Sequence, residues 1–319
     1  MRRVRRRLRL LELMGRIGSI EVSPAGLGTN NFGRRIDEAR TKEVVDAALD
    51  AGVTVFDTAN IYGEGKSEEF LGRALGSRRD GVTIVTKFGG GVKGGGRAEY
   101  VRKACDASLA RLGTDRIDVY LLHFPDATTP IGETLAAMNE MAAEGKVREI
   151  GCSNFTTEQL EEATAFATQN GLKPFVVVQN EFSLVHREPE RTGVLAAADK
   201  LGMAFMPYFP LASGALTGKY RRGQPAPAGT RLGGEGGKNA EDVIQPERID
   251  AVEKLIGFAE SRGHTILELA MSWVARRTPV ATVIAGATSA EQVRANAAAL
   301  SAWQLTDDDL REIDRITPG

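Results

Sequence analysis

Four side chains suited to acid–base chemistry stand at or just beyond the ends of predicted strands. The run from Val53 to Asp57 is apolar and partly β-branched, ends in a carboxylate, and is followed five positions later by the phenol of Tyr62. A second run of this kind ends at Lys87 and a third at His123. Such runs are typical of buried parallel strands, whose carboxyl ends share one edge of a sheet. The sequence therefore predicts that an acid, a phenol, an ammonium and an imidazole meet at one rim.

These four groups suit the transfer of a proton to an oxygen atom. A phenol with an ordinary pKa of about 10 is a poor proton donor at neutral pH. We expect the ammonium of Lys87 to lower the pKa of Tyr62, and Asp57 to hold Lys87 through an ion pair. His123 is expected to orient a substrate carbonyl or to share the proton. Because no nucleophile–base pair accompanies them, the set predicts protonation of an oxygen while another group supplies a hydride.

The order of predicted strands and helices favours one closed barrel. Short apolar strands alternate with amphipathic helices at a period of roughly thirty residues, without a linker. Strands are expected at 24–27, 53–57, 82–86, 118–122, 147–151, 175–178, 204–206 and 281–284. Helices are expected at 38–50, 68–75 with Ser67 as cap, 98–112, 131–143, 157–168, 190–200, 249–262, 266–276 and 290–300. This unbroken alternation predicts an α/β fold, a single (β/α)8 TIM barrel.

Further segments are expected around the barrel. Residues 1–13 are rich in arginine and lack the apolar core of a signal peptide, so we interpret them as a disordered tail outside a barrel domain at 14–319. A hairpin at 17–22 is expected to plug the barrel floor, and an extra helix at 306–316 to follow the barrel. Two glycine-rich loops on the rim, at 88–96 and 221–246, are predicted to be mobile or functional.

Composition excludes several classes of function. With 41 basic and 42 acidic residues the formal charge is −1, so no nucleic-acid partner is expected. No apolar run approaches the roughly 20 residues that span a membrane, so no membrane partner is expected. With two cysteines, Cys105 and Cys152, and three histidines, we expect free thiols, a cytoplasmic location and no metal site. The oligomeric state is left open.

Polar residues after the later strands suggest how a hydride-donating cofactor would be held. Tyr208 offers a face on which a flat ring can stack. The segment 285–289 leads into a helix N-terminus, which suits a phosphate group, and Gln292 and Asn296 share one face of that helix. No G-x-G-x-x-G motif follows a strand, so the cofactor is expected on a barrel rather than on a Rossmann domain. The groups available for a carboxamide belong to Ser153, Asn154 and Gln179.

In these residues and in the motifs around them, the chain resembles a known family, the aldo-keto reductases. The similarity runs from about Gly15 to Trp303, and its motifs follow the family's order: DTANIYGEGKSEEFLGRAL, TKFG, RLGTDRIDVYLLHFPD, GKVREIGCSNF, VQNEFSL, PLASGALTGKY and VIAGATSAEQVRAN. The resemblance implies a (β/α)8 barrel that uses NADPH, with Tyr62 as the proton donor. The matching catalytic positions are Asp57, Tyr62, Lys87 and His123.

The same resemblance implies a set of cofactor-binding residues. Around the nicotinamide these are Ser153, Asn154, Gln179 and Tyr208. On the pyrophosphate side they are Phe209, Pro210, Leu211, Ser213 and Lys219. At the adenosine end they are Gly286, Thr288, Gln292 and Asn296. The predicted set also includes two residues of the loop after the first strand, Thr29 and Asn30.

Two positions depart from the family pattern. Phe209 stands where many members have serine, and Ala295 stands where many have a glutamate that contacts adenine. The basic clamp that holds the 2′-phosphate in some branches is not evident. We expect NADPH rather than NADH, with Lys219 and Arg231 as the charges that would contact the 2′-phosphate.

Together these features predict an NADPH-dependent oxidoreductase that reduces a small aldehyde or ketone to an alcohol. The two long loops and the residues around Phe32 and Phe124 are expected to set the substrate, and the aromatic lining favours a compact, apolar carbonyl. One alternative is a regulatory subunit of the same fold, which binds NADPH but turns over slowly. Another is a metal-dependent barrel hydrolase, which would need further His or Asp ligands at strand ends.

Overall fold

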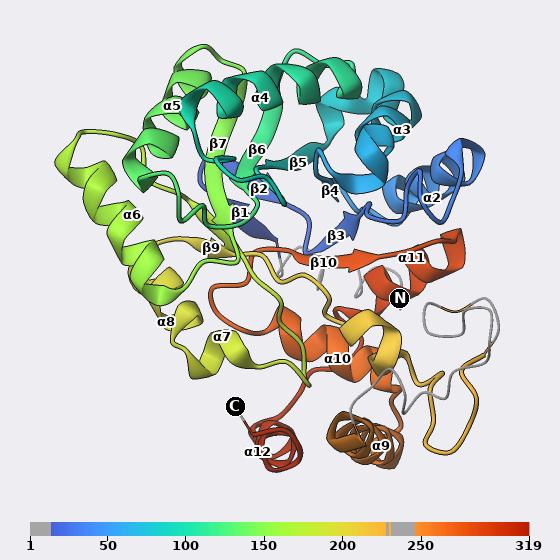
Figure 1. Ribbon diagram of the computed structural model, residues 1–319. Coiled ribbons are helices and arrows are strands. Elements are labelled where there is room, and N and C mark those ends of the chain that lie inside the picture. The colour runs from blue at the N-terminus through green and yellow to red at the C-terminus, as the bar shows by residue number, and fades with distance from the viewer. Residues whose placement is uncertain (1–13, 228–229, 231–245, 319) are drawn as a thin grey trace.

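Eight parallel strands curl into a barrel with helices around it (Figure 1). The computed structural model describes residues 14–227, 230 and 246–318. The strands of the barrel are β3 (Ala25–Gly28), β4 (Val55–Asp57), β5 (Thr83–Phe88), β6 (Ile117–Leu122), β7 (Val147–Ser153), β8 (Val177–Gln179), β9 (Ala204–Phe205) and β10 (Val283–Gly286). Their order in the sheet is β10-β3-β4-β5-β6-β7-β8-β9, so consecutive strands from β3 to β9 pair, and the last strand, β10, pairs with the first, β3. The predicted (β/α)8 barrel is confirmed.

Isolated bridges close the barrel between β9 and β10. The N–H of Ala281 donates to the carbonyl of Phe205 at 3.0 Å, and the N–H of Ile284 donates to the carbonyl of Pro207 at 2.9 Å. A parallel bridge also pairs Tyr208 with Ile284. Because all strands run the same way around the barrel, the loops that follow them share one rim.

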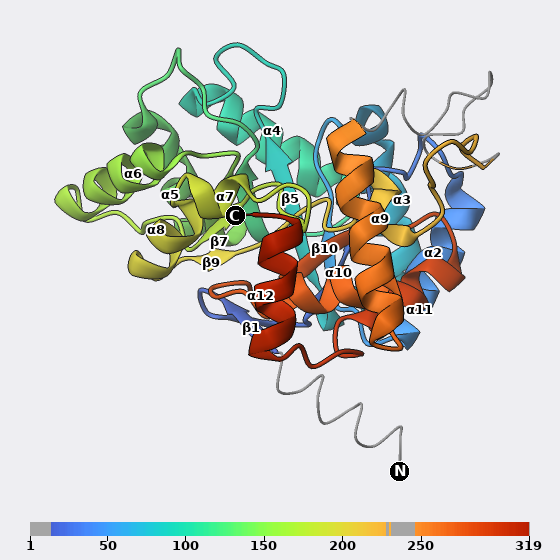
Figure 2. The ribbon, with the colours of Figure 1, turned by 90° about the horizontal axis from the view of Figure 1, so that it is seen from below.

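Helices cover the outside of the barrel (Figure 1). They are α2 (Glu38–Asp50), α3 (Lys66–Leu75), α4 (Ala98–Leu112), α5 (Ile131–Ala143), α6 (Thr157–Gln169), α7 (Glu188–Arg191), α8 (Val194–Lys200), α9 (Pro246–Ser261), α10 (Ile266–Ala275), α11 (Ala290–Ala299) and α12 (Asp307–Ile316). Short 3-10 segments are η1 (Tyr62–Gly65), η2 (Gly76–Gly81) and η3 (Ala212–Thr217). The extra C-terminal helix is α12, which lies beside α9 (Figure 2). Thr306 and Asp309 form a capping box at its start.

A hairpin fills the floor of the barrel, as predicted. It consists of β1 (Gly15–Ile17) and β2 (Ile20–Val22), and lies at one end of the barrel in Figure 2. Its apolar side chains belong to the inner core cluster, which is distinct from the larger cluster between the strands and the helices. At its turn, the N–H and the hydroxyl of Ser19 donate to Glu149 Oε1 at 2.8 and 2.7 Å.

The alternation of side chains along the strands places a polar layer above this inner core. Side chains two positions apart on a strand point to the same face. The inner core cluster includes Val55, Val85, Leu121, Val177 and Met206. The residue two positions after each of these, on the strand or just beyond its end, is polar: Asp57, Lys87, His123, Gln179 and Tyr208, respectively. The rim chemistry predicted from the sequence is therefore a consequence of strand periodicity.

Three local predictions are wrong. The helix predicted at 190–200 is interrupted, because Gly193 adopts a left-handed φ of 78° between α7 and α8. Ser67 does not cap α3; the cap is Gly65, and the Ser67 hydroxyl instead donates to the buried carbonyl of Thr29 at 2.9 Å. The strand predicted at 175–178 lies at 177–179, where it pairs with β7 and β9.

The two predicted rim loops are described to different extents. The tail 1–13 and most of the loop 221–246, Arg231 included, lie outside the described residues. The loop 88–96 is anchored at its end, because the N–H of Gly96 donates to Asp126 Oδ2 at 3.0 Å and its carbonyl accepts from Thr134 Oγ1 at 2.7 Å. Only its tip, at 91–93, is exposed, so the mobility of this loop stays a prediction, now limited to the tip.

A membrane-spanning segment was not expected from the sequence. Among the helices of the described residues, none combines the length and the apolar character required to cross a membrane.

Candidate active site

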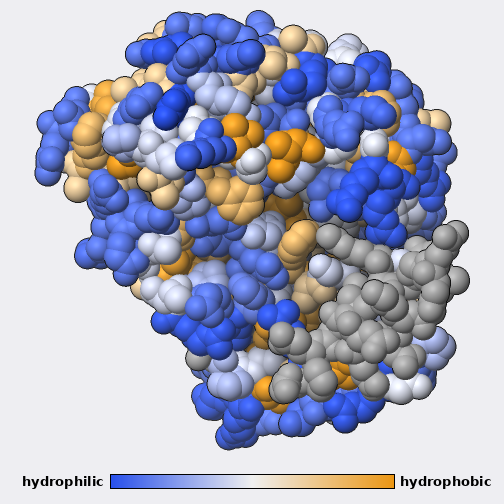
Figure 3. All heavy atoms as spheres, viewed as in Figure 1, coloured by the Kyte–Doolittle hydropathy of each residue, from blue (hydrophilic) through white to orange (hydrophobic). Residues whose placement is uncertain are grey.

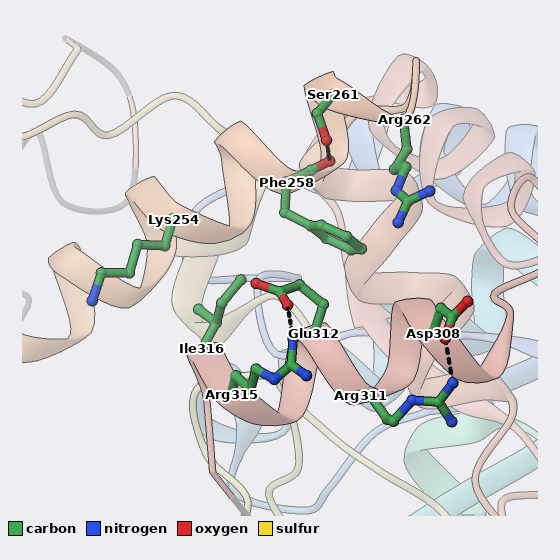
Figure 4. Close-up of a pocket in the computed structure, with 9 residues that line it drawn as sticks. All are labelled: Lys254, Phe258, Ser261, Arg262, Asp308, Arg311, Glu312, Arg315 and Ile316. Carbon is green, nitrogen blue, oxygen red and sulfur yellow. Dashed lines mark hydrogen bonds and ion pairs between the residues drawn. The ribbon is translucent and has the colours of Figure 1, made fainter.

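Two hollows in the described surface are large enough to hold a small molecule. One is a charged groove between α9 and α12 (Figure 4). Its arginines all have carboxylate partners on α12: Arg311 pairs with Asp308, Arg315 with Glu312 and Arg262 with Asp309. No predicted site residue lines this groove. The other hollow lies at the rim of the barrel (Figure 3) and has a volume of about 530 Å³. Because the side chains predicted to carry the chemistry gather at the second hollow, that cavity is the candidate active site.

The rim cavity brings the predicted site residues together. Every cofactor-binding residue predicted from the sequence lines it. Asp57, Tyr62 and His123 line it too, while Lys87 lies beneath it, 1% exposed. The volume falls within the range of cavities that hold small molecules and cofactors.

A buried ion pair forms the floor of the cavity. Nζ of Lys87 donates to Asp57 Oδ1 at 2.8 Å and to the carbonyl of Thr58 at 2.7 Å. Nε2 of Gln179 donates to the same carboxylate oxygen at 2.9 Å. Burial by itself would lower the pKa of Lys87, but the charge of Asp57 and the phenol of Tyr62 outweigh it, so this pKa is raised. Lys87 is therefore a permanent positive charge under the cavity.

Tyr62 stands above this ion pair, on the loop after β4. The loop is held to β5 because the N–H of Asn60 donates to the carbonyl of Lys87 at 3.0 Å. The centroid of the Tyr62 ring lies 5.2 Å from Nζ of Lys87. The rings of Tyr62 and His123 meet edge to face, with centroids 5.9 Å apart. Acid, ammonium, phenol and imidazole are thus neighbours, as the strand pattern predicts.

The pKa of Tyr62 is raised, not lowered as we expected. Burial of the phenol is the largest cause; the charge of Lys87 opposes it, and the charge of Asp57 adds to it. The expected effect of Lys87 is present, but its net outcome is wrong, because removing water from a phenolate costs more than one ammonium restores. Tyr62 therefore holds its proton at neutral pH, and Lys87 makes that proton easier to release than burial alone would allow.

His123 is a neutral imidazole beside the phenol. Burial, and then the charge of Lys87, lower its pKa to about 3. Its Nδ1 is buried without a hydrogen-bond partner, and the backbone of Gly90 packs so closely that a Cβ there would lie 2.8 Å from Nδ1. A neutral imidazole can orient an oxygen by a hydrogen bond but holds no acidic proton near pH 7. Of the two, Tyr62 is the better proton donor.

The predicted carboxamide-binding residues form a hydrogen-bonded wall. The hydroxyl of Ser153 donates to the carbonyl of Gln179 at 2.7 Å. Nδ2 of Asn154 donates to the carbonyl of His123 at 3.0 Å and to Ser153 Oγ at 3.1 Å. The hydroxyl of Tyr208 donates to Asn154 Oδ1 at 2.7 Å. The protein itself therefore fixes these side chains, and the ring of Tyr208 remains part of the lining.

Backbone strain gathers around the cavity. Among the described residues, the non-glycine residues with left-handed φ are Glu64, Asn154, Phe209, Ala212 and Ser213. Three of them, Asn154, Phe209 and Ser213, line the cavity. Such conformations cost about 1–3 kcal/mol each and are retained mostly at functional sites. The strain supports a ligand-binding role for these loops.

The far end of the cavity offers groups suited to phosphates. Lys219 lies against η3, since a Cβ at Gly214 would be 3.3 Å from its Nζ. At the start of α11, Ser289 is the N-cap, and the N–H of Thr288 donates to Gln292 Oε1 at 2.8 Å. A cation and a helix N-terminus are both favourable to an anion.

Sequence reasoning missed two arginines, of which Arg40 lies at this end. Arg35 lines the cavity from the loop after β3. Arg40, on α2, donates through Nε to the carbonyl of Thr288 at 3.2 Å and forms an ion pair with Glu43. Only the packing of α2 against α11 brings Arg40 there. The one signal in the sequence was the cluster of arginines at 34–40.

The residues around Phe32 and Phe124 differ in their surroundings. Phe32 itself is fully buried in the larger core cluster, whereas Asn31 and Arg35, close to it in sequence, line the cavity. That these residues set the substrate stays a prediction. Phe124 does line the cavity and stacks on His123, with centroids 4.7 Å apart. Thr29 borders the cavity, but its hydroxyl already donates to the carbonyl of Asp57 at 3.0 Å.

The described residues give no support to metal chemistry. No group of three or more His, Cys, Asp or Glu side chains suited to a metal ion occurs in the described part of the chain. The hydrolase alternative therefore lacks a ligand set within those residues.

Comparison with known proteins connects this site to a family. The model of the Aldo/keto reductase family matches residues 24–318. A rice protein described as a probable voltage-gated potassium channel subunit beta is 34% identical over 312 residues, 95% of this chain and 94% of its own. An L-glyceraldehyde 3-phosphate reductase of Escherichia coli is 30% identical over 300 residues, 90% and 86% of the two chains. Aldo-keto reductase YhdN of Bacillus subtilis is 33% identical over 313 residues, 93% and 90%.

Proposed function

The chain belongs to the aldo/keto reductase family, and from this premise we propose that it is an NADPH-dependent oxidoreductase that reduces an aldehyde or ketone to an alcohol. The observation that carries the proposal is the buried pair of Asp57 and Lys87 directly under Tyr62 and His123. Such a set can protonate an oxygen and then stabilise the phenolate that remains.

The residues around the cavity fit NADPH. The amides of Asn154 and Gln179 suit a carboxamide, Tyr208 offers a ring face, and Lys219 is a cation for a phosphate. When bound, NADPH supplies the hydride that adds to the carbonyl carbon. Tyr62 gives its proton to the carbonyl oxygen, so the product is the neutral alcohol. Solvent then returns a proton to Tyr62.

A panel of aldehydes and ketones tests the proposal. Loss of NADPH absorbance should accompany alcohol formation, one alcohol for each NADPH oxidised. A protein that binds NADPH yet reduces no member of a chemically broad panel would contradict the proposal.

The rate is expected to be independent of pH between about 5 and 9. In this window Tyr62, whose pKa is raised above 10.0, keeps its proton, and His123, whose pKa is about 3, stays neutral. The ratio kcat/KM should fall only as pH rises through the pKa of Tyr62, because the proton donor is lost there. Initial rates across this range, with circular dichroism to verify folding, measure the profile. A change in kcat/KM with its midpoint at about pH 6.5, the ordinary pKa of histidine, would contradict the account of His123.

The preference for NADPH over NADH is proposed to depend partly on Arg40. Its guanidinium lies on the carbonyl of Thr288, where the adenosine end is proposed to bind, and its partner Glu43 is exposed. An arginine that contacts a phosphate in solvent contributes a charge-assisted hydrogen bond. We expect Arg40→Ala to lower the NADPH/NADH ratio of kcat/KM about 5- to 10-fold.

Two further variants make this experiment specific. Glu43→Gln should raise the same ratio, because it releases Arg40 from its carboxylate partner. Arg294→Ala removes another arginine, from α11, without altering a contact to Thr288, and is the matched control. An unchanged ratio in Arg40→Ala, with NADPH-dependent reduction intact, would show that the 2′-phosphate is held elsewhere.

A regulatory role is a second candidate, favoured by the similarity to the rice channel subunit beta. Such a protein would oxidise one bound NADPH and then release the product slowly. Steady-state and single-turnover rates separate the two functions: similar rates support the reductase, whereas a single turnover far faster than the steady state supports a cofactor-sensing subunit.

A reducing, cytoplasmic location is also part of the proposal. Cys105 and Cys152 are both free and buried, and burial raises the pKa of the Cys105 thiol to about 12. Free thiols are what a reducing compartment maintains. Fractionation of the source cells checks the location, and recovery of the protein with an oxidising compartment would contradict it.

A further inference from the structure

A buried serine at the start of α3 lies behind the ion pair that forms the floor of the cavity. Ser67 is fully buried, as are Thr29 and Thr58, whose hydroxyls contact it. Its Oγ lies 2.8 Å from Thr29 Oγ1 and 2.9 Å from Thr58 Oγ1. We call these three side chains the hydroxyl cluster. Because a buried hydroxyl needs a hydrogen-bond partner within the protein, the three side chains hold one another in place.

The hydroxyl cluster is attached to the backbone of Asp57. The N–H of Thr29 and its hydroxyl both donate to the carbonyl of Asp57, at 2.9 and 3.0 Å. Ser67 in turn holds Thr29, both at its hydroxyl and at its carbonyl. The residue that carries the buried carboxylate is therefore linked to α3 through Thr29.

The next residue, Thr58, is held by Ser67 directly. Its N–H donates to the carbonyl of Val85 at 2.8 Å, which fixes it to β5, and its hydroxyl shares a hydrogen bond with Ser67. Its carbonyl accepts from Nζ of Lys87 at 2.7 Å. The contact with Ser67 restricts the rotation of Thr58, so it keeps this carbonyl directed at the ammonium.

The two links meet at Lys87. Its Nζ donates to Asp57 Oδ1 and to the carbonyl of Thr58, which belong to consecutive residues, and the hydroxyl cluster holds both of these residues. The charge of Lys87 favours the phenolate of Tyr62. A misplacement of about 1 Å in a group of this kind can lower a rate by a factor of about 10².

A purely structural role is the competing explanation, and another buried serine illustrates it. Ser272, on α10, is 1% exposed and donates to the carbonyl of Ala299 at 2.8 Å. It also accepts from the N–H of Trp303 at 3.2 Å, and it does not line the rim cavity. Since such a serine contributes to stability alone, the test must measure rate and stability separately.

We propose that Ser67 is a positioning residue, which fixes the two residues that hold the ammonium of Lys87. Ser67 does not line the cavity, so it acts through Asp57 and Thr58. This inference rests on the proposed reductase activity. It implies that loss of the Ser67 hydroxyl slows the chemical step, while NADPH and the aldehyde bind as before.

The test is Ser67→Ala, with single-turnover and steady-state kinetics on butanal and NADPH. We expect kcat and the single-turnover rate, per folded protein, to fall about 10-fold, while KM and the affinity for NADPH change less than about 2-fold. Thr58→Val removes the hydrogen bond to Ser67 from the other side with little change of shape, and should give the same result. If Ser67→Ala does not fold, Thr58→Val decides the question alone.

Ser272→Ala is the matched control. It should shift the midpoint of urea unfolding about as much as Ser67→Ala, because it also removes a buried hydroxyl, but should leave kcat unchanged. An equal loss of kcat in both variants would overturn the inference, since the rate would then follow stability.

A second arm places Ser67→Ala in the Lys87→Met variant. Without an ammonium to position, loss of the Ser67 hydroxyl should lower the single-turnover rate less than about 2-fold further. The full 10-fold loss in this background would overturn the inference, as would an unchanged kcat in folded Ser67→Ala, and both results would leave the reductase intact. Absence of turnover by the unaltered protein with butanal and every other aldehyde and ketone would contradict the reductase itself, and the inference with it.

Discussion

Tyr62→Phe is expected to lower carbonyl turnover at least about 10²-fold, the contribution of a well-placed general acid. The variant keeps the aromatic ring, and with it the edge-to-face contact to His123 and the position over Lys87. What it loses is the acidic hydroxyl. Single-turnover rates with NADPH bound measure this loss, and NADPH affinity measured by fluorescence should change little.

Tyr208→Phe is the matched control, since Tyr208 is a second phenol in the same cavity. Burial raises the pKa of Tyr208 to about 12, and its hydroxyl is already donated to Asn154 at 2.7 Å. Loss of the Tyr208 hydroxyl should weaken cofactor binding and should not slow the chemical step. If Tyr208→Phe slowed the single-turnover rate as much as Tyr62→Phe, the proton donor would have been misassigned.

Lys87→Met is expected to affect both stability and turnover. It leaves the carboxylate of Asp57 buried with the Gln179 amide at 2.9 Å but without a cation. An unpaired buried charge of this kind costs about 3–5 kcal/mol of unfolding free energy. Turnover should fall about 10²-fold as well, because the phenolate of Tyr62 loses its neighbouring positive charge. Denaturant unfolding and single-turnover kinetics measure the two effects.

The double variant Asp57→Asn/Lys87→Met separates these effects. With both charges removed, most of the lost stability should return, since a neutral pair needs no compensation. Turnover should stay low, because the cation is still missing. Lys42→Met, in the surface pair with Asp46, is the control and should cost at most about 1 kcal/mol. A double variant as active as the unaltered protein would show that the buried pair is only structural.

Much of the fold was predictable because the barrel strands are short apolar runs that can be recognised in the sequence. Apolar runs such as 82–86 and 118–122 end where polar residues begin, and the two-residue alternation then fixes which face Lys87 and His123 occupy. The site followed from the same rule, since neighbouring parallel strands bring their ends to one rim. The motifs that resemble aldo-keto reductases added the cofactor-binding residues, and all of these border the cavity.

The errors arose where tertiary contacts override local preference. Gly193 interrupts a helix that composition alone would continue, and Ser67, expected to cap α3, instead donates to a buried carbonyl. The pKa of Tyr62 depends on a balance between burial and charge, and burial cannot be measured from sequence. Arg40 reaches Thr288 only because two helices far apart in sequence pack together.

The most direct test of the central claim is a single turnover of the NADPH-loaded protein with a short aldehyde. We predict that NADPH oxidation and alcohol formation proceed at one rate and in equal amounts, and that the NADPH persists when Tyr62 is replaced by phenylalanine. Persistence of NADPH in the unaltered protein, or its consumption at an undiminished rate by the Tyr62→Phe variant, would contradict the claim that this phenol completes a hydride transfer.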